Sequence, residues 1–511
     1  MSPKTIQTLN PRTGNFLAQE YVISTPEELN HKVTDAQLAF MVYRKTSGNE
    51  RAILLETIAD EIEAVKEEIL SIATLETGLP AGRIQGETGR TLGQLRLFAE
   101  VAQEEFWVEA SIDTALPDRQ PLPKSDIRKC LVPLGPIAVF GASNFPLAFS
   151  TAGGDTASAL ASGNPVIVKA HNSHLGTHQC ICDAIARALE RCNLPKGIFS
   201  SIIDEGYELG ADLVQHPGIK AVGFTGSFNG GTALLDLVSK RKEPIPFYGE
   251  MGSINPIVLL PSALEDPKMV STLMGSINMG VGQFCTNPGL ILAIEGEAAQ
   301  HFCLKMTDAI QQTLGEVMLN RAIYDKYEAS IAEMSSEKAY TLLGQGTKAQ
   351  GALAVQPSLA LTSGKKFLTH PKMSQEIFGP YSLIVLCEHQ EELAEILMQI
   401  EGQLTLSFMG EETEFEEQVH LIVLAQEKVG RIIFNGVPTG VEVGHSMIHG
   451  GPFPATTAPN STSVGADAIK RFARPVCFQD APQSLLPMAL QDENPLKIFR
   501  KINGKWSLDK I

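Results

Sequence analysis

Short runs of β-branched and aromatic residues alternate with longer helical stretches from Pro136 onward, and this alternation constrains the fold more than any other feature. The runs occupy residues 137–140, 166–168, 199–203 and 221–224. Strands separated by helices predict βαβ crossovers, and therefore a parallel sheet with helices on its faces. We expect an α/β protein with a doubly wound sheet in this region.

The chain is too long, at 511 residues, for one ordinary hydrophobic core, so we expect two principal domains. Helical patterns fill the first hundred or so residues: a capping box at 25–28 opens a helix towards Arg44, and a second helix is predicted from about Glu50 to about Thr77. A second α/β region begins after Glu250, with apolar runs at 255–260 and 382–386. The composition then shifts to Gly, Pro, Ser and Thr, which predicts a loop-rich return.

These patterns divide the chain into four parts. We assign residues 1–113 and 133–250 to the first domain and 251–449 to the second, catalytic domain. Residues 450–477 form the return segment, and residues 114–132 and 478–511 form a small β arm and a tail. The Pro-rich stretch at 117–124 fits a surface loop and an arm that contacts another subunit equally well.

Charge and cysteine content exclude several classes of protein. A formal net charge of -17 argues against a nucleic-acid or anionic-membrane surface, and no apolar run is long enough to span a bilayer. The N-terminal residues lack the apolar core of a signal peptide. The eight cysteines are scattered, with neither a disulfide framework nor paired zinc ligands, so we expect a reducing, cytoplasmic location and no metal site.

Cys285 lies in a segment rich in turn formers, residues 282–289, where a ligand can reach a thiol. A single cysteine is more often a small buried hydrophobe than a nucleophile. Three other segments, 140–146, 249–252 and 375–380, change that interpretation. Together with Cys285 they offer a nucleophile, an oxyanion donor in Asn144 and a general base in Glu250.

A phosphate-binding turn can be placed at residues 224–231, although the GxGxxG fingerprint is absent. This segment follows a strand and opens a helix, so its backbone N–H groups at Gly226 and the Ser227 hydroxyl can meet a pyrophosphate. An ordinary strand-to-helix turn also uses Gly and Ser. Lys169 ends a strand where open parallel sheets bind ligands, and it is equally compatible with a solvated lysine.

Taken in order, Asn144, Lys169, the Phe-Thr-Gly-Ser turn, Glu250, Cys285 and the segment 376–380 resemble the aldehyde dehydrogenase superfamily over nearly the whole chain. Segments 154–160, 434–443 and 449–454 are similar to the branch that contains α-ketoglutarate semialdehyde dehydrogenases and an NADP-dependent fatty aldehyde dehydrogenase. The resemblance implies a Rossmann-like cofactor domain, a catalytic α/β domain and a small β oligomerisation arm. It also implies a homodimer or homotetramer.

The resemblance implies a role for each motif. The Cys285 thiolate attacks the aldehyde, while the Asn144 amide and the Cys285 backbone N–H hold the oxyanion, and hydride leaves to a nicotinamide. Glu250 then activates water to hydrolyse the thioester, and it also helps to remove the thiol proton. Glu376 binds the nicotinamide ribose and Phe378 supports the nicotinamide ring.

Asn172 and His449 depart from the commoner pattern of the superfamily. Many NAD-preferring relatives carry a glutamate at the position of Asn172, so its absence removes repulsion against a 2′-phosphate. The related NADP-specific enzyme has an arginine where this chain has Tyr207, so we expect NADP or NAD with a slight preference for NADP. His449 replaces an aromatic residue, and either relays a proton or positions the cofactor, or simply lines the funnel.

The substrate is indicated less directly. If Asn144 opens a helix, Phe145, Phe149 and Ala152 share a face that either lines the aldehyde channel or packs in the core. Arg96 is a candidate partner for a substrate carboxylate, and is also a typical surface arginine. We therefore expect α-ketoglutarate semialdehyde as substrate, with a medium- or long-chain aliphatic aldehyde as the alternative.

Two further alternatives concern the type of function. CoA-acylating chemistry is disfavoured because Glu250 is present to activate water. A non-catalytic binding module on the same fold would be free to lose Cys285, Glu250 or Asn144, and the chain retains all three.

Overall fold

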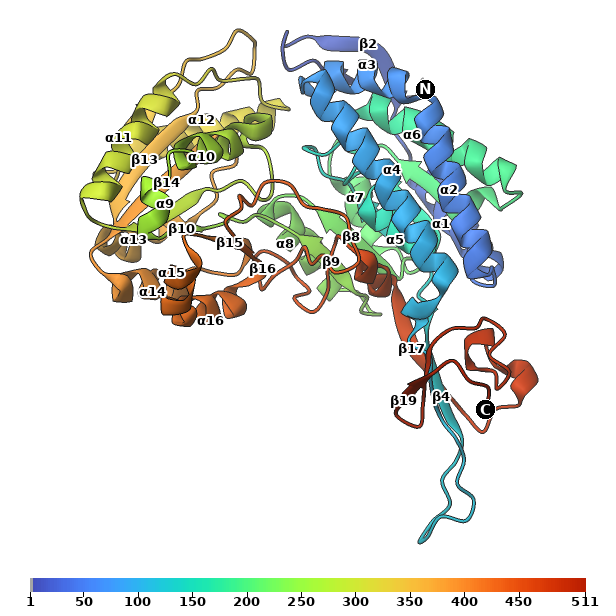
Figure 1. Cartoon of the computed structure of the whole chain (residues 1–511). Helices are drawn as coiled ribbons and strands as arrows, with labels where there is room; N and C mark the ends of the chain where they lie inside the picture. Colours follow the sequence, from blue (N-terminus) through green and yellow to red (C-terminus); the bar gives the residue numbers. More distant parts are fainter. Residues whose placement is uncertain (1–2) are drawn as a thin grey trace.

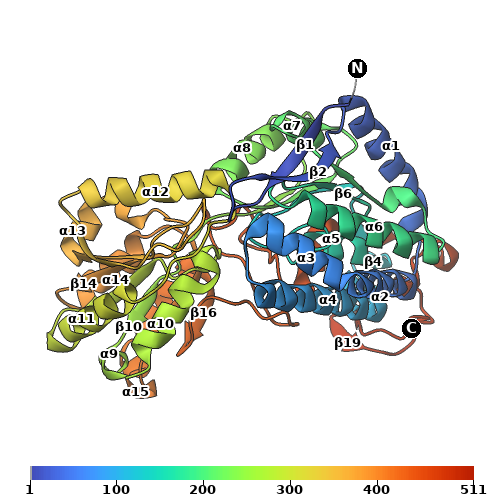
Figure 2. The ribbon, with the colours of Figure 1, turned by 90° about the horizontal axis from the view of Figure 1, so that it is seen from above.

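The computed structural model describes residues 3–511 and shows two α/β lobes with an extended arm below one of them (Figure 1). Seen from above, the two lobes lie side by side (Figure 2). The predicted fold class, a Rossmann-like parallel-sheet domain with a second α/β domain, is confirmed. Within residues 3–511 every helix is too short or too polar to cross a membrane.

The first lobe contains a five-stranded parallel sheet in the order β7-β6-β5-β8-β9. Its strands are β5 (Ile137–Phe140), β6 (Val166–Lys169), β7 (Phe199–Ile202), β8 (Ala221–Thr225) and β9 (Phe247–Glu250). The crossover helices are α5 (Gly154–Ala161), α6 (Leu175–Arg191), α7 (Glu208–Gln215) and α8 (Phe228–Ser239). The order reverses direction at β5, as expected for a doubly wound sheet.

Alternate residues of these strands enter two different cores. Ile137 and Val139 pack with α2 (Gly48–Ala64), α4 (Ala81–Glu104), α5 and α6, whereas Ala138 and Phe140 pack with α1 (Pro26–Tyr43), α7 and α8. Because β5 is buried on both faces, all four of its residues are apolar, and this uninterrupted apolar run predicts the strand from the sequence. A short β-hairpin, β1 (Thr5–Leu9) and β2 (Phe16–Val22), completes this lobe.

In the helical N-terminal region the first predicted helix is confirmed at its start, and the second predicted helix differs from the structure. The predicted capping box is present: the Thr25 side chain accepts from the backbone N–H of Glu28, and the Glu28 side chain accepts from that of Thr25. The predicted single helix from Glu50 to Thr77 is instead two helices, α2 and α3 (Lys66–Thr77). Val65 separates them with non-helical angles of φ -110° and ψ 18°.

The second lobe is built on a seven-stranded sheet in the order β12-β13-β14-β11-β10-β15-β16, in which only the edge strand β12 is antiparallel. Its strands are β10 (Ile257–Leu259), β11 (Leu290–Ile294), β12 (Thr341–Gln345), β13 (Ser358–Ser363), β14 (Tyr381–Cys387), β15 (Gln403–Met409) and β16 (Val429–Phe434). One face is covered by α9 (Pro261–Glu265), α10 (Met269–Asn278) and α11 (Glu297–Gln311). The other is covered by α12 (Arg321–Ser336), α13 (Gly364–Thr369), α14 (Gln390–Gln399) and α16 (Val419–Lys428), and α15 (Glu412–Glu417) lies beside α16 in sequence.

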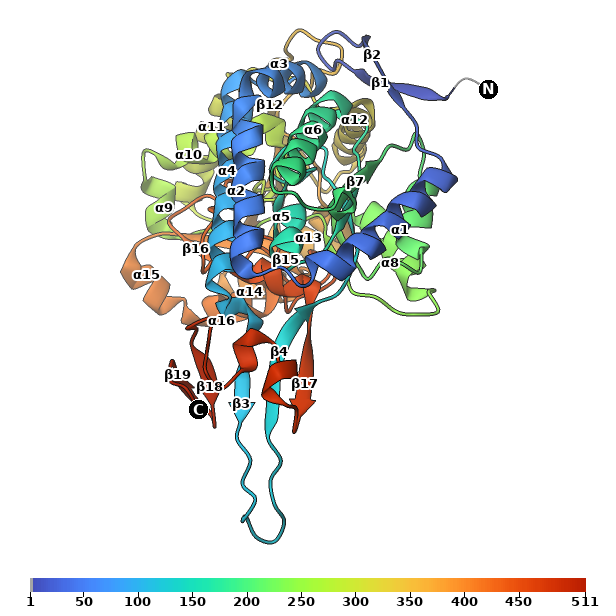
Figure 3. The ribbon, with the colours of Figure 1, turned by 90° about the vertical axis from the view of Figure 1, so that its right-hand side faces the viewer.

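The arm belongs to a third sheet, five-stranded, in the order β17-β4-β3-β18-β19 (Figure 3). It combines β3 (Ser111–Asp113) and β4 (Ile127–Pro133) with β17 (Ala473–Gln479), β18 (Arg500–Ile502) and β19 (Lys505–Ser507). The strand β17 straddles the predicted division between the return segment and the tail. Between β3 and β4 the chain projects as a long loop, in which Leu116 and Lys124 form an isolated bridge.

The segment after β5 corrects one prediction. Residues 141–153 form turns, and the first helix after β5 begins only at Gly154, so Asn144 does not open a helix. The shared helical face proposed for Phe145, Phe149 and Ala152 therefore does not exist. Ala152 packs in the core of the first lobe, whereas Phe145 and Phe149 belong to a separate apolar cluster.

Candidate active site

The first lobe contributes residues from the carboxyl edge of its sheet. Lys169 ends β6 and Glu250 ends β9, while Asn144 and Ser227 follow β5 and β8. Because the strands are parallel and in register, with Phe140 opposite Lys169 and Thr225 opposite Glu250, these groups line one edge. Open α/β sheets bind their ligands at this edge, outside the carboxyl ends of the strands.

The second lobe contributes residues that precede its strands. Cys285 lies in the loop before β11, and Glu376 lies in the segment before β14. The Asn255 side chain fixes the cysteine loop, because its Nδ2 donates to the carbonyls of Cys285 at 2.8 Å and Asn287 at 3.0 Å. Gly282 has φ 62°, and a Cβ there would overlap the carbonyl of Gly379, so the approach of the two segments requires glycine.

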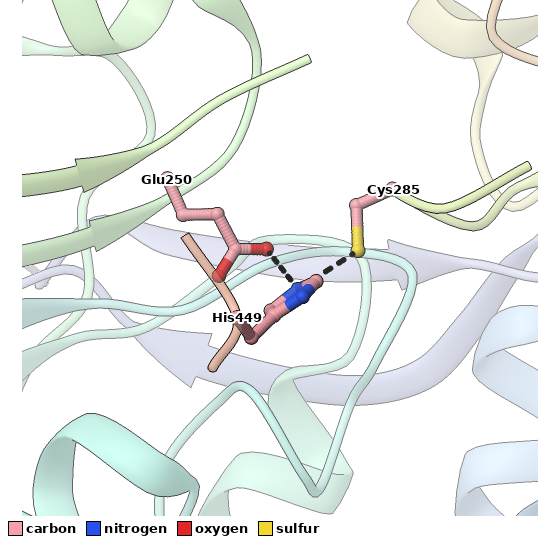
Figure 4. A group of neighbouring side chains, drawn as sticks. All are labelled: Glu250, Cys285 and His449. Atoms are coloured by element: carbon pink, nitrogen blue, oxygen red, sulfur yellow. Dashed lines mark hydrogen bonds and ion pairs between the residues drawn. The ribbon is translucent and has the colours of Figure 1, made fainter. Parts of the chain in front are cut away.

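Cys285, His449 and Glu250 converge where the two lobes meet (Figure 4). His449 Nε2 lies 3.5 Å from Cys285 Sγ and 2.9 Å from Glu250 Oε1. His449 and Glu250 are buried, with 1% and 3% of their surfaces exposed, whereas Cys285 is half-buried. Cys285 is therefore the least buried residue of the three.

The return segment holds this cluster together. The His449 backbone N–H donates to Thr462 Oγ1 at 2.8 Å, and the Ser463 hydroxyl donates to the second carboxylate oxygen of Glu250. Sequence reasoning missed Ser463, because only the folded return segment brings a serine of this loop-rich stretch against β9. No local pattern marks it out from its serine and threonine neighbours.

Burial and neighbouring charges set the protonation of the cluster. Burial, followed by the negative charge of Glu250, raises the pKa of the Cys285 thiol well above its usual value. Burial acts to raise the pKa of Glu250 as well, but His449 and the hydrogen bonds from His449, Ser463 and Cys285 outweigh it and lower that pKa. At neutral pH the site therefore contains a thiol beside an ionised carboxylate.

Both contacts of the His449 ring use the same nitrogen. An ionised carboxylate only accepts hydrogen bonds, so Nε2 at 2.9 Å from it carries the hydrogen. A histidine that relays a proton between two groups contacts them through its two different nitrogens, whereas His449 contacts both Cys285 and Glu250 through Nε2. Its Nδ1 is buried and has no partner among residues 3–511.

The thiol, imidazole and carboxylate also lie close enough to one another, within 4.8 Å, to serve as three ligands of a metal ion. The sequence did not anticipate this proximity. Hydrogen bonds within the cluster already occupy Nε2 and both oxygens of Glu250. The expectation of no metal site stays a prediction.

Asn144 reaches the cysteine loop directly. Its Nδ2 donates to the carbonyl of Gln283 at 2.9 Å, which ties the turn after β5 to the segment that carries Cys285. A carboxamide has two N–H groups, so one donor of Asn144 remains available beside the loop that carries Cys285.

Phenylalanines form the wall of the site. The ring of Phe145 lies 5.2 Å from that of Phe149 and 5.1 Å from that of Phe284, and Phe149 lies 6.2 Å from the His449 ring. The structure thus brings two of the predicted substrate residues to the cluster, and it adds Phe284, the neighbour of Cys285, which the sequence did not single out.

Arg96 is not part of this wall, contrary to prediction. Its guanidinium donates to Glu63 at 2.9 Å and lies within 3.7 Å of Glu56 and Asp60, on an exposed surface of α2 and α4. At about 100° per residue, the helix turns Arg96 away from the side that carries Arg90. Arg90, which sequence reasoning missed, packs on Phe149 with its guanidinium carbon 4.9 Å from the ring centre.

The predicted cofactor residues lie around an edge that retains free polar atoms. Asn172 Nδ2 donates to the Asp204 carbonyl at 2.8 Å, while its Oδ1 is buried and has no partner among residues 3–511. Burial lowers the pKa of Lys169, an effect that Asp204 opposes. Ser227 caps α8 by accepting from Gly230 N–H at 3.2 Å, and Gly226 precedes it.

Glu376 and Phe378 line a cavity together with Ser253 and Phe284. Among residues 3–511, the Ser253 backbone N–H at 3.4 Å is the one hydrogen-bond donor to the Glu376 carboxylate, and burial raises the pKa of Glu376 to about 7. The unpartnered Asn172 Oδ1 and the Glu376 carboxylate are acceptors that match the hydroxyl groups of a ribose. The residues present therefore fit a nicotinamide dinucleotide, although Tyr207, which is 91% exposed, offers no cation for a 2′-phosphate.

The fold and this thiol–carboxylate site define an aldehyde-oxidising dehydrogenase, and comparison with known proteins agrees. The chain belongs to the aldehyde dehydrogenase family, whose model matches residues 1–452. It is an NAD(P)-dependent aldehyde dehydrogenase that uses a nicotinamide cofactor.

Two bacterial relatives align over nearly the full length. The chain is 46% identical over 507 residues to alpha-ketoglutaric semialdehyde dehydrogenase 2 of Azospirillum brasilense, covering 99% of this chain and 97% of the relative. It is 43% identical over 507 residues to alpha-ketoglutaric semialdehyde dehydrogenase of Acinetobacter baylyi, covering 98% and 95%.

Solved structures share the fold. Betaine aldehyde dehydrogenase from Staphylococcus aureus in complex with NAD+ superposes with a TM-score of 0.80 at 18% identity, covering 94% of this chain and 92% of the other. Glyceraldehyde-3-phosphate dehydrogenase from Methanocaldococcus jannaschii complexed with NADP gives 0.79 at 20% identity, covering 94% and 99%.

Proposed function

We propose that this enzyme oxidises α-ketoglutarate semialdehyde to α-ketoglutarate without an acyl acceptor other than water. The observation that carries the proposal is the cluster of Cys285, His449 and Glu250, in a chain 46% and 43% identical to two enzymes named for that semialdehyde. The cluster supplies the nucleophile and the base, and the relatives supply the substrate class.

The first step forms the nucleophile. The Cys285 thiol is protonated at rest, so its proton must leave before the sulfur attacks the aldehyde carbon. Glu250 is the ionised acceptor within the cluster. The hydrogen on His449 Nε2 can be shared between Glu250 and the sulfur and stabilise the thiolate that forms, since both atoms lie within 3.5 Å of that nitrogen.

Attack converts the aldehyde oxygen to an oxyanion. The second N–H of Asn144 and the backbone N–H of Cys285 are the donors for it. Lys169, Asn172, Gly226, Ser227, Glu376 and Phe378 would hold the cofactor, which supplies the hydride acceptor when bound. The product of this stage is a thioester on Cys285.

Glu250 first passes the proton taken from the thiol to solvent, and its carboxylate then removes a proton from water, which attacks the acyl carbon and releases the carboxylic acid together with the Cys285 thiolate. The carboxylate is poised for this role because its lowered pKa keeps it ionised at neutral pH. Turnover that is independent of CoA is the expected behaviour, and product formation that requires CoA would contradict it.

NADP or NAD serves as cofactor, with a slight preference for NADP. Asn172 in place of a carboxylate supports tolerance of a 2′-phosphate, because a negative charge would repel it. The absence of a cation at Tyr207 keeps the preference small.

A medium- or long-chain aliphatic aldehyde is the second candidate substrate, because the wall of Phe145, Phe149 and Phe284 is apolar. The test is formation of reduced cofactor from α-ketoglutarate semialdehyde, pentanal and hexanal, with NAD and NADP in parallel. A much higher kcat/KM for hexanal or longer aldehydes than for the semialdehyde would reject the first candidate.

A homodimer or homotetramer is the expected assembly, with the projecting β3–β4 loop and the tail after Cys477 as its contacts. Light scattering on the full chain, compared with a chain lacking residues 115–125, measures this directly. A monomer for the full chain would contradict the expectation.

A further inference from the structure

Arg90 is a partly buried cation that the chemistry at Cys285 does not use. It lies on α4 beside the phenylalanine wall, with its guanidinium carbon 4.9 Å from the Phe149 ring centre and 5.9 Å from that of Phe145. Two of its nitrogens, Nε and Nη2, are buried and have no hydrogen-bond partner among residues 3–511. A buried donor without a partner is costly, and a charged one more so.

Neighbouring acids do not neutralise Arg90 through a hydrogen bond. Glu87 is the nearest buried carboxylate on the same helix, and its oxygens already accept from Arg83 and from the backbone N–H groups of Leu147 and Ala148 at 2.9 Å. Arg83 is thus paired, whereas Arg90 is left with open donors.

Arg90 is also close to the reacting sulfur. Its charge acts to lower the pKa of Cys285, against the larger effects of burial and Glu250, and the Phe149 ring lies 4.9 Å from the Arg90 guanidinium carbon and 6.2 Å from the His449 ring. A guanidinium with two free donors is the side chain best suited to hold a carboxylate through paired N–H···O bonds.

We propose that Arg90 binds the carboxylate at the far end of the substrate and makes the enzyme selective for short ω-oxo acids over uncharged aldehydes. This inference rests on the function proposed above, and names the residue that recognises the acid. Arg90 is a specificity-determining residue here: the aldehyde carbon meets Cys285 while the carboxylate satisfies Nε and Nη2. An uncharged aldehyde leaves those donors empty.

The test measures kcat/KM for α-ketoglutarate semialdehyde and for pentanal, which has the same chain length and no charge. Arg90→Gln is expected to lower the value for the semialdehyde by about 100-fold, because a charge pair is lost from a desolvated site. The value for pentanal is expected to change by less than about threefold, which is within ordinary mutational scatter. Arg96→Gln on the exposed side of the same helix is the matched control, with both substrates expected to behave as in the wild type.

A second measurement does not depend on turnover. α-Ketoglutarate, the product, is expected to protect Cys285 of the wild type from iodoacetamide, and to do so at least about tenfold less well in Arg90→Gln. Circular dichroism melting of each variant shows whether the fold persists. Arg90→Lys keeps the charge without the paired donors and is expected to fall between the two.

The outcomes separate the inference from the proposed function. Equal losses for both substrates in Arg90→Gln would mean that Arg90 only supports the site or activates the thiol, and would overturn the inference alone. Unchanged selectivity and protection would overturn it as well. A wild type that prefers pentanal to the semialdehyde would reject the proposed substrate, and this inference with it.

Discussion

The two large sheets meet at the active site with opposite edges. The five-stranded sheet presents the carboxyl ends of its strands, where Lys169 and Glu250 are the last residues of β6 and β9. The seven-stranded sheet presents the amino ends, so Cys285 and Glu376 lie in loops that lead into β11 and β14. One edge offers strand termini and helix N-termini, and the other offers loops anchored by side chains such as Asn255.

The difference explains how one cleft can serve two tasks. Free backbone N–H groups at helix N-termini suit the phosphates of a cofactor, which matches the position of Ser227 at the start of α8. A nucleophile instead needs a loop that exposes its sulfur. Glu250 is the residue that crosses the division, because it ends β9 of the five-stranded sheet and its carboxylate lies within 4.8 Å of the Cys285 thiol of the other lobe.

Removing the Cys285 thiol should produce the largest effect. It should abolish the chemistry of the loop that carries Cys285 and leave the edge of the five-stranded sheet, where we expect the cofactor, unaffected. Cys285→Ala is expected to lower kcat by about four orders of magnitude or more, as loss of a covalent nucleophile does. Cofactor affinity, measured by calorimetry, should stay within about twofold. Cys477→Ala, at an exposed cysteine of the arm, is the control, and substantial turnover in Cys285→Ala would refute the assignment.

Glu250→Gln tests the residue that links the two edges. Loss of the general base is expected to lower kcat by about 10²–10⁴-fold. Hydrolysis should become slower than hydride transfer, so mass spectrometry should detect an acyl group on Cys285 after mixing with substrate. If the variant turned over slowly with no acyl-enzyme, the base for the second step would lie elsewhere.

His449 variants distinguish an N–H donor from a proton relay. His449→Phe removes the hydrogen at Nε2 and should lower kcat/KM by about 100-fold, whereas His449→Gln restores a donor and should recover about tenfold of that loss. A thiolate without this donor should form less readily, so alkylation by iodoacetamide should shift to higher pH in His449→Phe. Equal activity in both variants would exclude the donor role.

Titration of Glu376 should give a smaller effect, a pH dependence of the KM for the cofactor that leaves the chemistry at Cys285 unchanged. Its folded-state pKa of about 7 means that it loses its proton as the pH rises through neutrality. The ionised form is the better acceptor for ribose hydroxyls, so the KM for the cofactor should fall by about three- to tenfold over that range. Glu376→Gln should remove this dependence, and a profile identical to the wild type would argue that Glu376 does not touch the ribose.

Much of the first lobe could be predicted from sequence because its signals are local. The strand at 137–140 reads directly from four consecutive apolar residues, and the capping box at Thr25 is encoded within four positions. The break at Val65 was missed, because the apolar period continues across it and only the packing of α2 and α3 on different neighbours requires the turn. The turn at 141–153 was missed for a similar reason, since Glu87 on a distant helix holds it through the backbone N–H groups of Leu147 and Ala148.

The sequence alone determined which groups are available for chemistry. Cys285, Glu250 and Asn144 stand in short, Gly- or Pro-bearing segments whose local patterns can be read without the fold. The tertiary structure decided how these groups lie relative to one another. Glu250 and His449 are 199 residues apart in the chain, and folding brings them to 2.9 Å. Only packing could show that Ser463 donates to Glu250, that Ala152 lies in a core and that Arg90 rather than Arg96 packs on Phe149. Each of these depends on contacts between residues distant in sequence, which no local pattern encodes.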